Sequence, residues 1–196
     1  MIERYCRADM ADLWSLENRY EAWLKVELAV CEAWFEKGRI DPQSMKEIRE
    51  RVAVDVERIA EIEEVTRHDV IAFISSLEEK VGPASRFIHL GCTSSDIVDT
   101  ANALLLVEAG EMILAGYDKL LNTLKNCVEK YRGLICMGRT HGIHAEPTTY
   151  SLKFAGFYAE FKRHKERFGQ ALEDVRVGKL SGAVGTYTVL SPDIEE

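Results

Sequence analysis

Apolar residues recur at steps of three and four positions along almost the whole chain, which is the spacing of one face of an α-helix. Polar capping residues interrupt this pattern, and Ser15, Asp41 and Asp55 each stand just before an apolar stretch. In the first half of the chain, helices are expected over residues 15–37, 41–52 and 69–81, with a short one beginning at Asp55. The pattern predicts an all-α fold.

Two longer apolar patterns follow, over residues 95–131 and 148–177. The first contains no proline and would form a helix roughly 55 Å long at the usual α-helical rise. Because a small domain cannot cover a helix of that length, we expect a long bundle that is shared between subunits. A small N-terminal helical domain is therefore expected over residues 1–91, followed over residues 92–196 by the first part of a central helical bundle.

The last residues carry the signals of a helix start. Ser191 is a good capping residue, Pro192 suits the first helical position, and the acidic residues after it suit the first turn. We therefore expect the chain to be an N-terminal fragment of a longer protein.

Composition and charge limit which kinds of molecule the protein is expected to bind. The 196 residues are 46% hydrophobic and 30% charged, which is typical of a globular protein. A net charge of −8 argues against nonspecific binding to nucleic acid or to an anionic membrane. Five cysteines without C-x-x-C spacing, together with the lack of an apolar signal segment or membrane-spanning run, predict a cytoplasmic protein.

The segment from Gly138 to Pro147 is the strongest candidate for chemistry. It holds an arginine, a threonine, a glutamate and two histidines between glycines and a proline, so it is too polar for a core helix. We expect a loop between the two long helices that presents its side chains. His141 or His144 is an acid–base candidate, because histidine exchanges a proton near neutral pH. No other His or Cys lies at convincing ligand spacing, so no metal site is expected.

Two further polar segments precede predicted helices. In Thr66–Val70, a guanidinium, an imidazole and free helix N–H groups would converge on an anion, although capping by Asp69 or Thr66 explains half of these residues equally well. In Gly91–Asp96, three consecutive hydroxyls exceed the need of one cap, which favours anion binding. The sequence has no G-x-S-x-G, H-E-x-x-H or dinucleotide motif, so nucleophilic, zinc and redox chemistry lack support and no cofactor is expected.

Together these segments closely resemble the adenylosuccinate lyases of the fumarase/aspartase superfamily, over essentially the whole chain. The matching stretches are Arg4-Tyr5 and residues 66–70, 93–100, 138–142 and 179–187. The resemblance implies a β-elimination that releases fumarate from adenylosuccinate, giving AMP, and from the succinylaminoimidazole carboxamide ribotide intermediate of purine biosynthesis. The chain corresponds to about the first half of a family member.

The resemblance also implies roles for individual residues. His141 corresponds to the general acid that protonates the departing nitrogen, and His68 to a neighbouring catalytic histidine that binds substrate. The substrate-binding positions, for the nucleotide and the anionic groups, are Arg4, Tyr5, Arg67, His68, Asp69, Thr93 and Ser94. His89 is a further candidate for this neighbourhood, with no role assigned.

The resemblance implies that this chain alone lacks two things that an active family member needs. The general base, a serine on a mobile loop, falls beyond residue 196, and family members are homotetramers in which each site combines three chains. We therefore expect activity from the intact tetramer and none from this fragment alone. Two alternatives stay open: another lyase of the superfamily, such as argininosuccinate lyase, and a helical oligomerisation module without chemistry. The Thr66–Val70 segment favours the purine enzyme.

Overall fold

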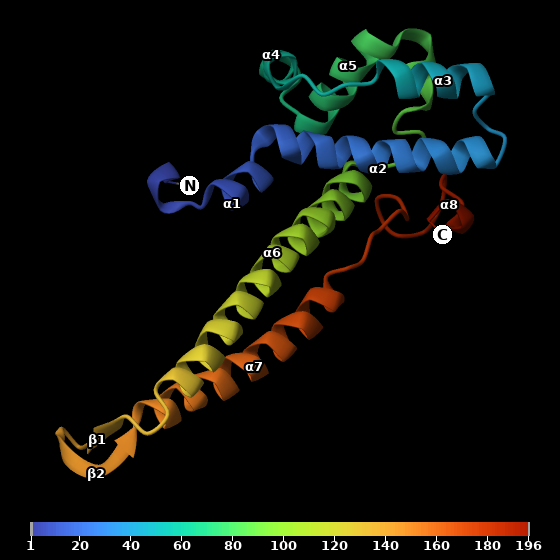
Figure 1. Ribbon diagram of the computed structural model, residues 1–196. Helices are drawn as coiled ribbons and strands as arrows, with labels where there is room; N and C mark the ends of the chain where they lie inside the picture. Colours follow the sequence, from blue (N-terminus) through green and yellow to red (C-terminus); the bar gives the residue numbers. More distant parts are fainter. Residues whose placement is uncertain (1, 196) are drawn as a thin grey trace. The chain divides into compact units, whose positions relative to one another are not determined.

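The computed structural model describes residues 2–195 and confirms the predicted helical architecture (Figure 1). The chain forms two compact units, one of Met1–Leu106 with Arg176–Glu196 and the other of Val107–Val175. The long helix α6, Ser94–Lys130, contributes residues to both units. The expected division of the chain into domains of residues 1–91 and 92–196 stays a prediction. None of the helices within residues 2–195 is both long enough and apolar enough to cross a membrane.

The first unit begins with five helices and two short 3-10 segments. The helices are α1 (Ala8–Leu13), α2 (Leu16–Glu36), α3 (Pro42–Arg51), α4 (Val56–Thr66) and α5 (Asp69–Val81), and the 3-10 segments are Glu3–Tyr5 and Gly82–Phe87. The predicted caps Ser15, Asp41 and Asp55 are confirmed, since each side chain accepts a hydrogen bond from the backbone N–H three residues later.

The cap of α5 differs from the prediction. His68 occupies the capping position, and its ring Nδ1 accepts a hydrogen bond from the backbone N–H of Ile71 at 3.4 Å. Neither Asp69 nor Thr66 is the cap: Asp69 is already the first helical residue, and Thr66 ends the preceding helix. A neutral imidazole nitrogen can accept this bond in place of a carboxylate or hydroxyl oxygen, which capping preferences alone do not suggest.

Aromatic residues form the centre of the first unit. Phe73 of α5 stacks on Tyr20 of α2 with the ring centres 5.8 Å apart, and it meets the edge of Trp23 at 5.5 Å. All three side chains are buried. The cluster holds α5 against α2 and thereby fixes where the first turn of α5, with His68 and Asp69, is presented.

The C-terminal segment belongs to the same unit. Its helix α8, Pro192–Glu195, begins where the sequence predicts. Lys37 Nζ lies 2.7 Å from Asp193 Oδ2, which ties α8 to the end of α2, and Ile194 is buried.

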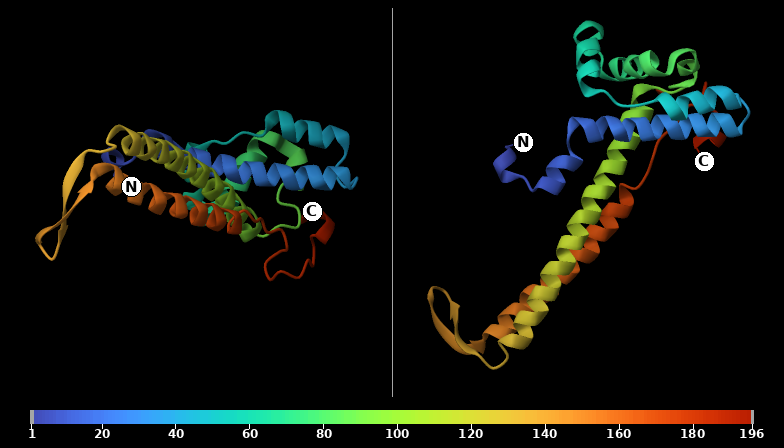
Figure 2. Two further views of the ribbon diagram at one scale, coloured as in Figure 1. Left: turned by 60° about the horizontal axis from the view of Figure 1, so that its bottom comes forward. Right: turned by 45° about the horizontal axis from the view of Figure 1, so that its top comes forward.

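The second unit contains two helices and a small sheet. Its part of α6 lies alongside α7, Tyr150–Asp174, as Figure 2 shows. Gly110 makes room for this packing, since a Cβ atom at that position would lie 2.3 Å from Leu172 Cδ1. The rings of Tyr117 and Phe168, 6.1 Å apart, belong to the same interface. Both ends of α7 fall within three residues of the predicted range.

The predicted loop at Gly138–Pro147 is wrong in its secondary structure. These residues belong to an antiparallel β-hairpin of β1, Ile135–Thr140, and β2, Ile143–Thr149. Most of its side chains are exposed. In β2, apolar and polar residues do alternate from Ile143 to Thr148, which is the pattern of a strand, but the glycines, the proline and the polar composition favoured a loop. Backbone hydrogen bonds join the two strands. The place of the hairpin between the two long helices is as predicted.

Candidate active site

The junction of α4 and α5 brings three predicted site residues together. Arg67 ends α4 in the left-handed conformation, with φ of 53°, and its guanidinium extends into solvent 3.7 Å from Glu64. His68 Nδ1 and Asp69 Oδ1 lie 3.6 Å apart, and Asp69 accepts a hydrogen bond from its neighbour's backbone N–H at 2.8 Å. The backbone N–H groups of Val70 and Ile71 are thus already bonded to side chains of this segment, and they are not free to bind an anion.

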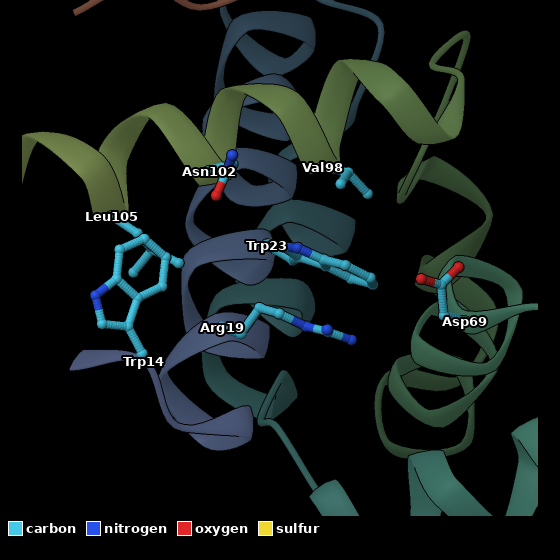
Figure 3. Close-up of a pocket in the computed structure, with 7 residues that line it drawn as sticks. All are labelled: Trp14, Arg19, Trp23, Asp69, Val98, Asn102 and Leu105. Atoms are coloured by element: carbon cyan, nitrogen blue, oxygen red, sulfur yellow. The ribbon is translucent and has the colours of Figure 1, made fainter. Parts of the chain in front are cut away.

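Asp69 also lines a pocket of about 320 Å³ within the first unit (Figure 3). The helices α2 and α6 and the residue that follows α1 supply its other residues, which are Trp14, Arg19, Trp23, Val98, Asn102 and Leu105. The Arg19 guanidinium lies 5.1 Å from the centre of the Trp23 ring, and Figure 3 shows the two side chains extending side by side. A flat aromatic wall beside a cation, an amide and a carboxylate suits a polar heterocyclic ligand, and the volume is at the lower end for small-molecule sites.

The start of α6 is held by a buried carboxylate. The Asp96 side chain has no exposed surface, and its Oδ2 accepts a hydrogen bond from the Thr93 N–H at 2.9 Å. Burial alone raises the pKa of Asp96, but the Lys179 ammonium and the backbone N–H groups outweigh it, so the pKa lies below its ordinary value. Asp96 is therefore a fixed negative charge beneath the Thr93–Ser94 hydroxyls.

The segment before α6 is anchored to α2. Glu27 is buried. Its Oε1 lies 2.6 Å from His89 Nδ1, and its Oε2 accepts a hydrogen bond from the His89 backbone N–H at 2.9 Å. Trp34 Nε1 donates to the Leu90 carbonyl at 3.0 Å. Because the His89 ring is bonded to Glu27, His89 anchors the segment before α6 to α2 in this structure. Burial raises the pKa of the nearby Cys92 thiol, which keeps it protonated.

Arg4 and Tyr5 contact each other at the N-terminal end. The Arg4 guanidinium lies 4.8 Å from the centre of the Tyr5 ring and donates to its hydroxyl at 3.3 Å. Tyr5 is 73% exposed. The pair is therefore available to a ligand rather than committed to the core.

His141 stands at the tip of the β-hairpin in the second unit. Its φ is 51° and that of Gly142 is 76°, and these two residues alone separate the paired residues Thr140 and Ile143. Two successive positive φ values in a two-residue loop are the signature of a type I′ turn. Both His141 and His144 are exposed, but His141 stands on the turn, whereas the backbone of His144 is paired within β2 opposite Arg139. The two histidines, which residue types alone leave as alternatives, thus differ in backbone position and not in exposure.

Gly138 is essential to the shape of this hairpin. The strand register shifts between Met137 and Arg139, which is the mark of a bulge, and a Cβ atom at position 138 would lie 2.6 Å from the Glu146 carbonyl oxygen. Because that contact is with backbone, the strands would have to separate.

We therefore predict that Gly138→Ala loosens the hairpin, with amide hydrogen exchange across β1 and β2 faster by about fivefold or more. The control is Gly156→Ala in α7, where an added Cβ meets nothing within 4 Å and exchange should not increase. Unchanged exchange in the Gly138 variant would show that the bulge accommodates a side chain.

The lyase family profile matches residues 5–196 of the chain. The chain belongs to the lyase family. Over the whole chain it is 49% identical to an adenylosuccinate lyase from Aquifex aeolicus and 47% identical to one from Staphylococcus saprophyticus. It spans 46% and 45% of the lengths of these two relatives, so less than half of each.

A solved structure of the same fold supports this family assignment. The fumarate lyase from Mesorhizobium sp. BNC1 matches 95% of this chain with a TM-score of 0.88 at 27% identity, and the chain covers 46% of it. The predicted resemblance to the fumarase/aspartase superfamily is thereby confirmed at the level of family and fold.

Within this lyase-family chain, sequence reasoning missed the buried pair of Asp96 and Lys179. Asp96 had a local signal, because the Thr-Ser-Ser-Asp run has the spacing of a capping box. Lys179 lies in the matching stretch 179–187, but no local pattern pairs it with Asp96, because 83 residues separate the two. The pocket residues Trp14, Arg19 and Asn102 likewise have no shared sequence motif. Within residues 2–195, no three His, Cys, Asp or Glu side chains gather as metal ligands would.

Proposed function

We propose that the intact protein is an adenylosuccinate lyase. It eliminates fumarate from adenylosuccinate to give AMP, and likewise cleaves succinylaminoimidazole carboxamide ribotide in purine biosynthesis. The observation that carries this proposal is the identity of 47–49% along the whole chain with two relatives of that name. The chain's own site features suit such a substrate, which carries two carboxylates and a phosphate.

The reaction breaks a carbon–nitrogen bond and forms the double bond of fumarate. A base removes the proton from the carbon next to one carboxylate, and the resulting aci-carboxylate needs donors aimed at it. We assign the base to the part of the protein outside this chain, as the family resemblance implies. Thr93 and Ser94 are assigned to the anionic groups of the substrate, where their hydroxyls and the positive end of α6 favour negative charge.

His141 is assigned as the general acid that protonates the departing nitrogen. Its exposed position on a two-residue turn supports this role, because the turn presents the ring without burying it. His68 is assigned as its catalytic neighbour, and Arg4, Tyr5, Arg67 and Asp69 as nucleotide-binding residues. The aromatic and polar walls of the Asp69 pocket support binding of a heterocyclic base or its ribose.

We further propose that the intact protein acts in the cytoplasm as a homotetramer with shared sites. Large apolar side chains stand exposed on the hairpin and at the start of α7, among them Ile135, Ile143 and Leu152. Exposed apolar surface of this kind marks contacts with further protein. The five cysteines are all free thiols, which suits a reducing compartment.

The test is to offer the intact protein a set of succinyl compounds and to follow the ultraviolet absorbance of released fumarate. We expect turnover with adenylosuccinate and the related imidazole ribotide, and none with argininosuccinate or aspartate. Turnover with argininosuccinate instead would replace this proposal with the alternative lyase. No release of fumarate from any of them would favour a helical oligomerisation module. The 196-residue chain alone should show no sustained turnover.

A further inference from the structure

Lys179 sits at the centre of a hydrogen-bonded cluster that joins two distant parts of the first unit. Its ammonium donates to Ser95 Oγ at 2.8 Å, to Asp96 Oδ1 at 2.8 Å and to the Gly182 carbonyl at 2.9 Å. A lysine ammonium has three N–H donors. All three are therefore used inside the protein, which leaves Lys179 no donor for a substrate.

Asp96 completes the cluster from the other side. Its Oδ1 accepts from Lys179 and from the backbone N–H groups of Ser181 and Gly182, both at 3.2 Å. Its Oδ2 accepts from the Thr93 N–H at 2.9 Å. One carboxylate thus ties the start of α6 to the turn at residues 181–182.

The backbone of Lys179 is anchored separately. The Thr100 hydroxyl accepts from the Lys179 N–H at 2.9 Å and lies 3.1 Å from its carbonyl oxygen. The main chain at position 179 is therefore held on α6 even without the ammonium. A change confined to the Lys179 side chain should release Ser95 and Asp96 without detaching the segment.

The three consecutive hydroxyls of Thr93, Ser94 and Ser95 differ in whether the cluster binds them. Ser95 accepts from Lys179, whereas within residues 2–195 the Thr93 and Ser94 hydroxyls have no hydrogen-bond partner. We propose that Lys179 and Asp96 are positioning residues, which fix the Thr93–Asp96 turn so that the Thr93 and Ser94 hydroxyls meet an anionic group of the substrate. This inference rests on the proposed function, which assigns those two hydroxyls to substrate. Neither Lys179 nor Asp96 touches the reacting atoms.

The energetics of an ion pair between the buried Asp96 and the half-buried Lys179 explain why the arrangement would be rigid. Removing one partner leaves an uncompensated buried charge, whereas the complete pair satisfies its donors and acceptors. The Asp96 side chain is fully buried while 34% of the Lys179 side chain is exposed, so loss of the ammonium leaves the buried carboxylate with one partner fewer. A turn built on this pair therefore has one arrangement, and substrate binding need not order it.

The experiment uses the intact protein and its fumarate-releasing reaction. We expect Lys179→Met to raise the KM for the succinyl substrate about tenfold or more, because two hydrogen bonds that fix the turn are lost. The kcat should change by less than about threefold, because no group at the reacting atoms is removed. Assays are run well below the unfolding temperature, so that lost stability does not lower the active fraction.

Two further variants separate positioning from general stability. Ser95→Ala removes one acceptor without stranding a buried charge, and it should raise KM several-fold. In Ser95→Ala/Lys179→Met the KM should be no higher than in Lys179→Met, since both changes break the same contact. The control is Arg49→Met, which breaks an exposed ion pair with Glu32 at 2.7 Å in the same unit and should leave KM unchanged.

An unchanged KM in folded Lys179→Met would overturn the inference. If that variant does not fold, an unchanged KM in Ser95→Ala overturns it instead. The proposed function is tested separately by the unmodified protein: should it cleave a different succinyl compound, the same variants are measured with that compound.

Discussion

Replacing His141 by alanine in the intact protein is expected to lower turnover about 10²–10⁴-fold, with only a modest loss of substrate binding. The physical reason is that the departing nitrogen would lose its proton donor, whereas the hairpin that carries residue 141 makes its ladder bonds through the backbone. The measurement is kcat and KM for fumarate release, with circular dichroism to verify that the variant is folded.

His144→Ala is the matched control for this change. Both histidines belong to the same hairpin, but His144 is paired within β2 and His141 stands at the turn. We expect His144→Ala to keep turnover within about tenfold of the unmodified protein, below the range for loss of a general acid. Near-normal turnover of His141→Ala would remove His141 from the acid role, and a large loss only in the His144 variant would transfer the role to His144.

Replacing Phe73 by alanine is expected to destabilise the intact protein by about 3–5 kcal/mol. Phe73 has no exposed surface, and its ring packs between Tyr20 and Trp23 with centre distances of 5.8 and 5.5 Å. Its removal would leave a cavity that these two rings cannot close without moving α2. The measurement is the midpoint and slope of denaturant unfolding, followed by tryptophan fluorescence because Trp23 is part of the cluster.

The control for this second change is Ile71→Ala on the same helix. Ile71 is 49% exposed, so its truncation should cost about 1 kcal/mol or less. Similar unfolding midpoints for the Phe73 and Ile71 variants would contradict the packing argument and would mean that α5 is held chiefly by other contacts.

Several features of the fold follow from local sequence. The helix starts at Ser15, Asp41 and Asp55 were predicted because each cap satisfies a backbone N–H only three residues away. The extent of the long helix α6 was predicted equally well, because its apolar period continues without proline. The exposed polar segment around His141 was recognised from composition alone. Such features depend on neighbours within one helical turn or on residue type.

Three features were not predicted, each for a different reason. The hairpin around Gly138 forms because backbone groups pair across a ladder. Its second strand alternates apolar and polar residues from Ile143 to Thr148, but the polar composition and the glycines favoured a loop. The capping role of His68 depends on the orientation of its ring. The pocket beside Asp69 exists because three helices meet there.

Sequence by itself determined the helices, the caps at Ser15, Asp41 and Asp55, and the polar segments that resemble a lyase site. Tertiary structure alone decided how those segments are held, most clearly in the buried contact between Asp96 and Lys179. The physical reason is that capping and periodicity are satisfied within a few residues, whereas a buried charge needs a partner that only the folded chain brings into reach.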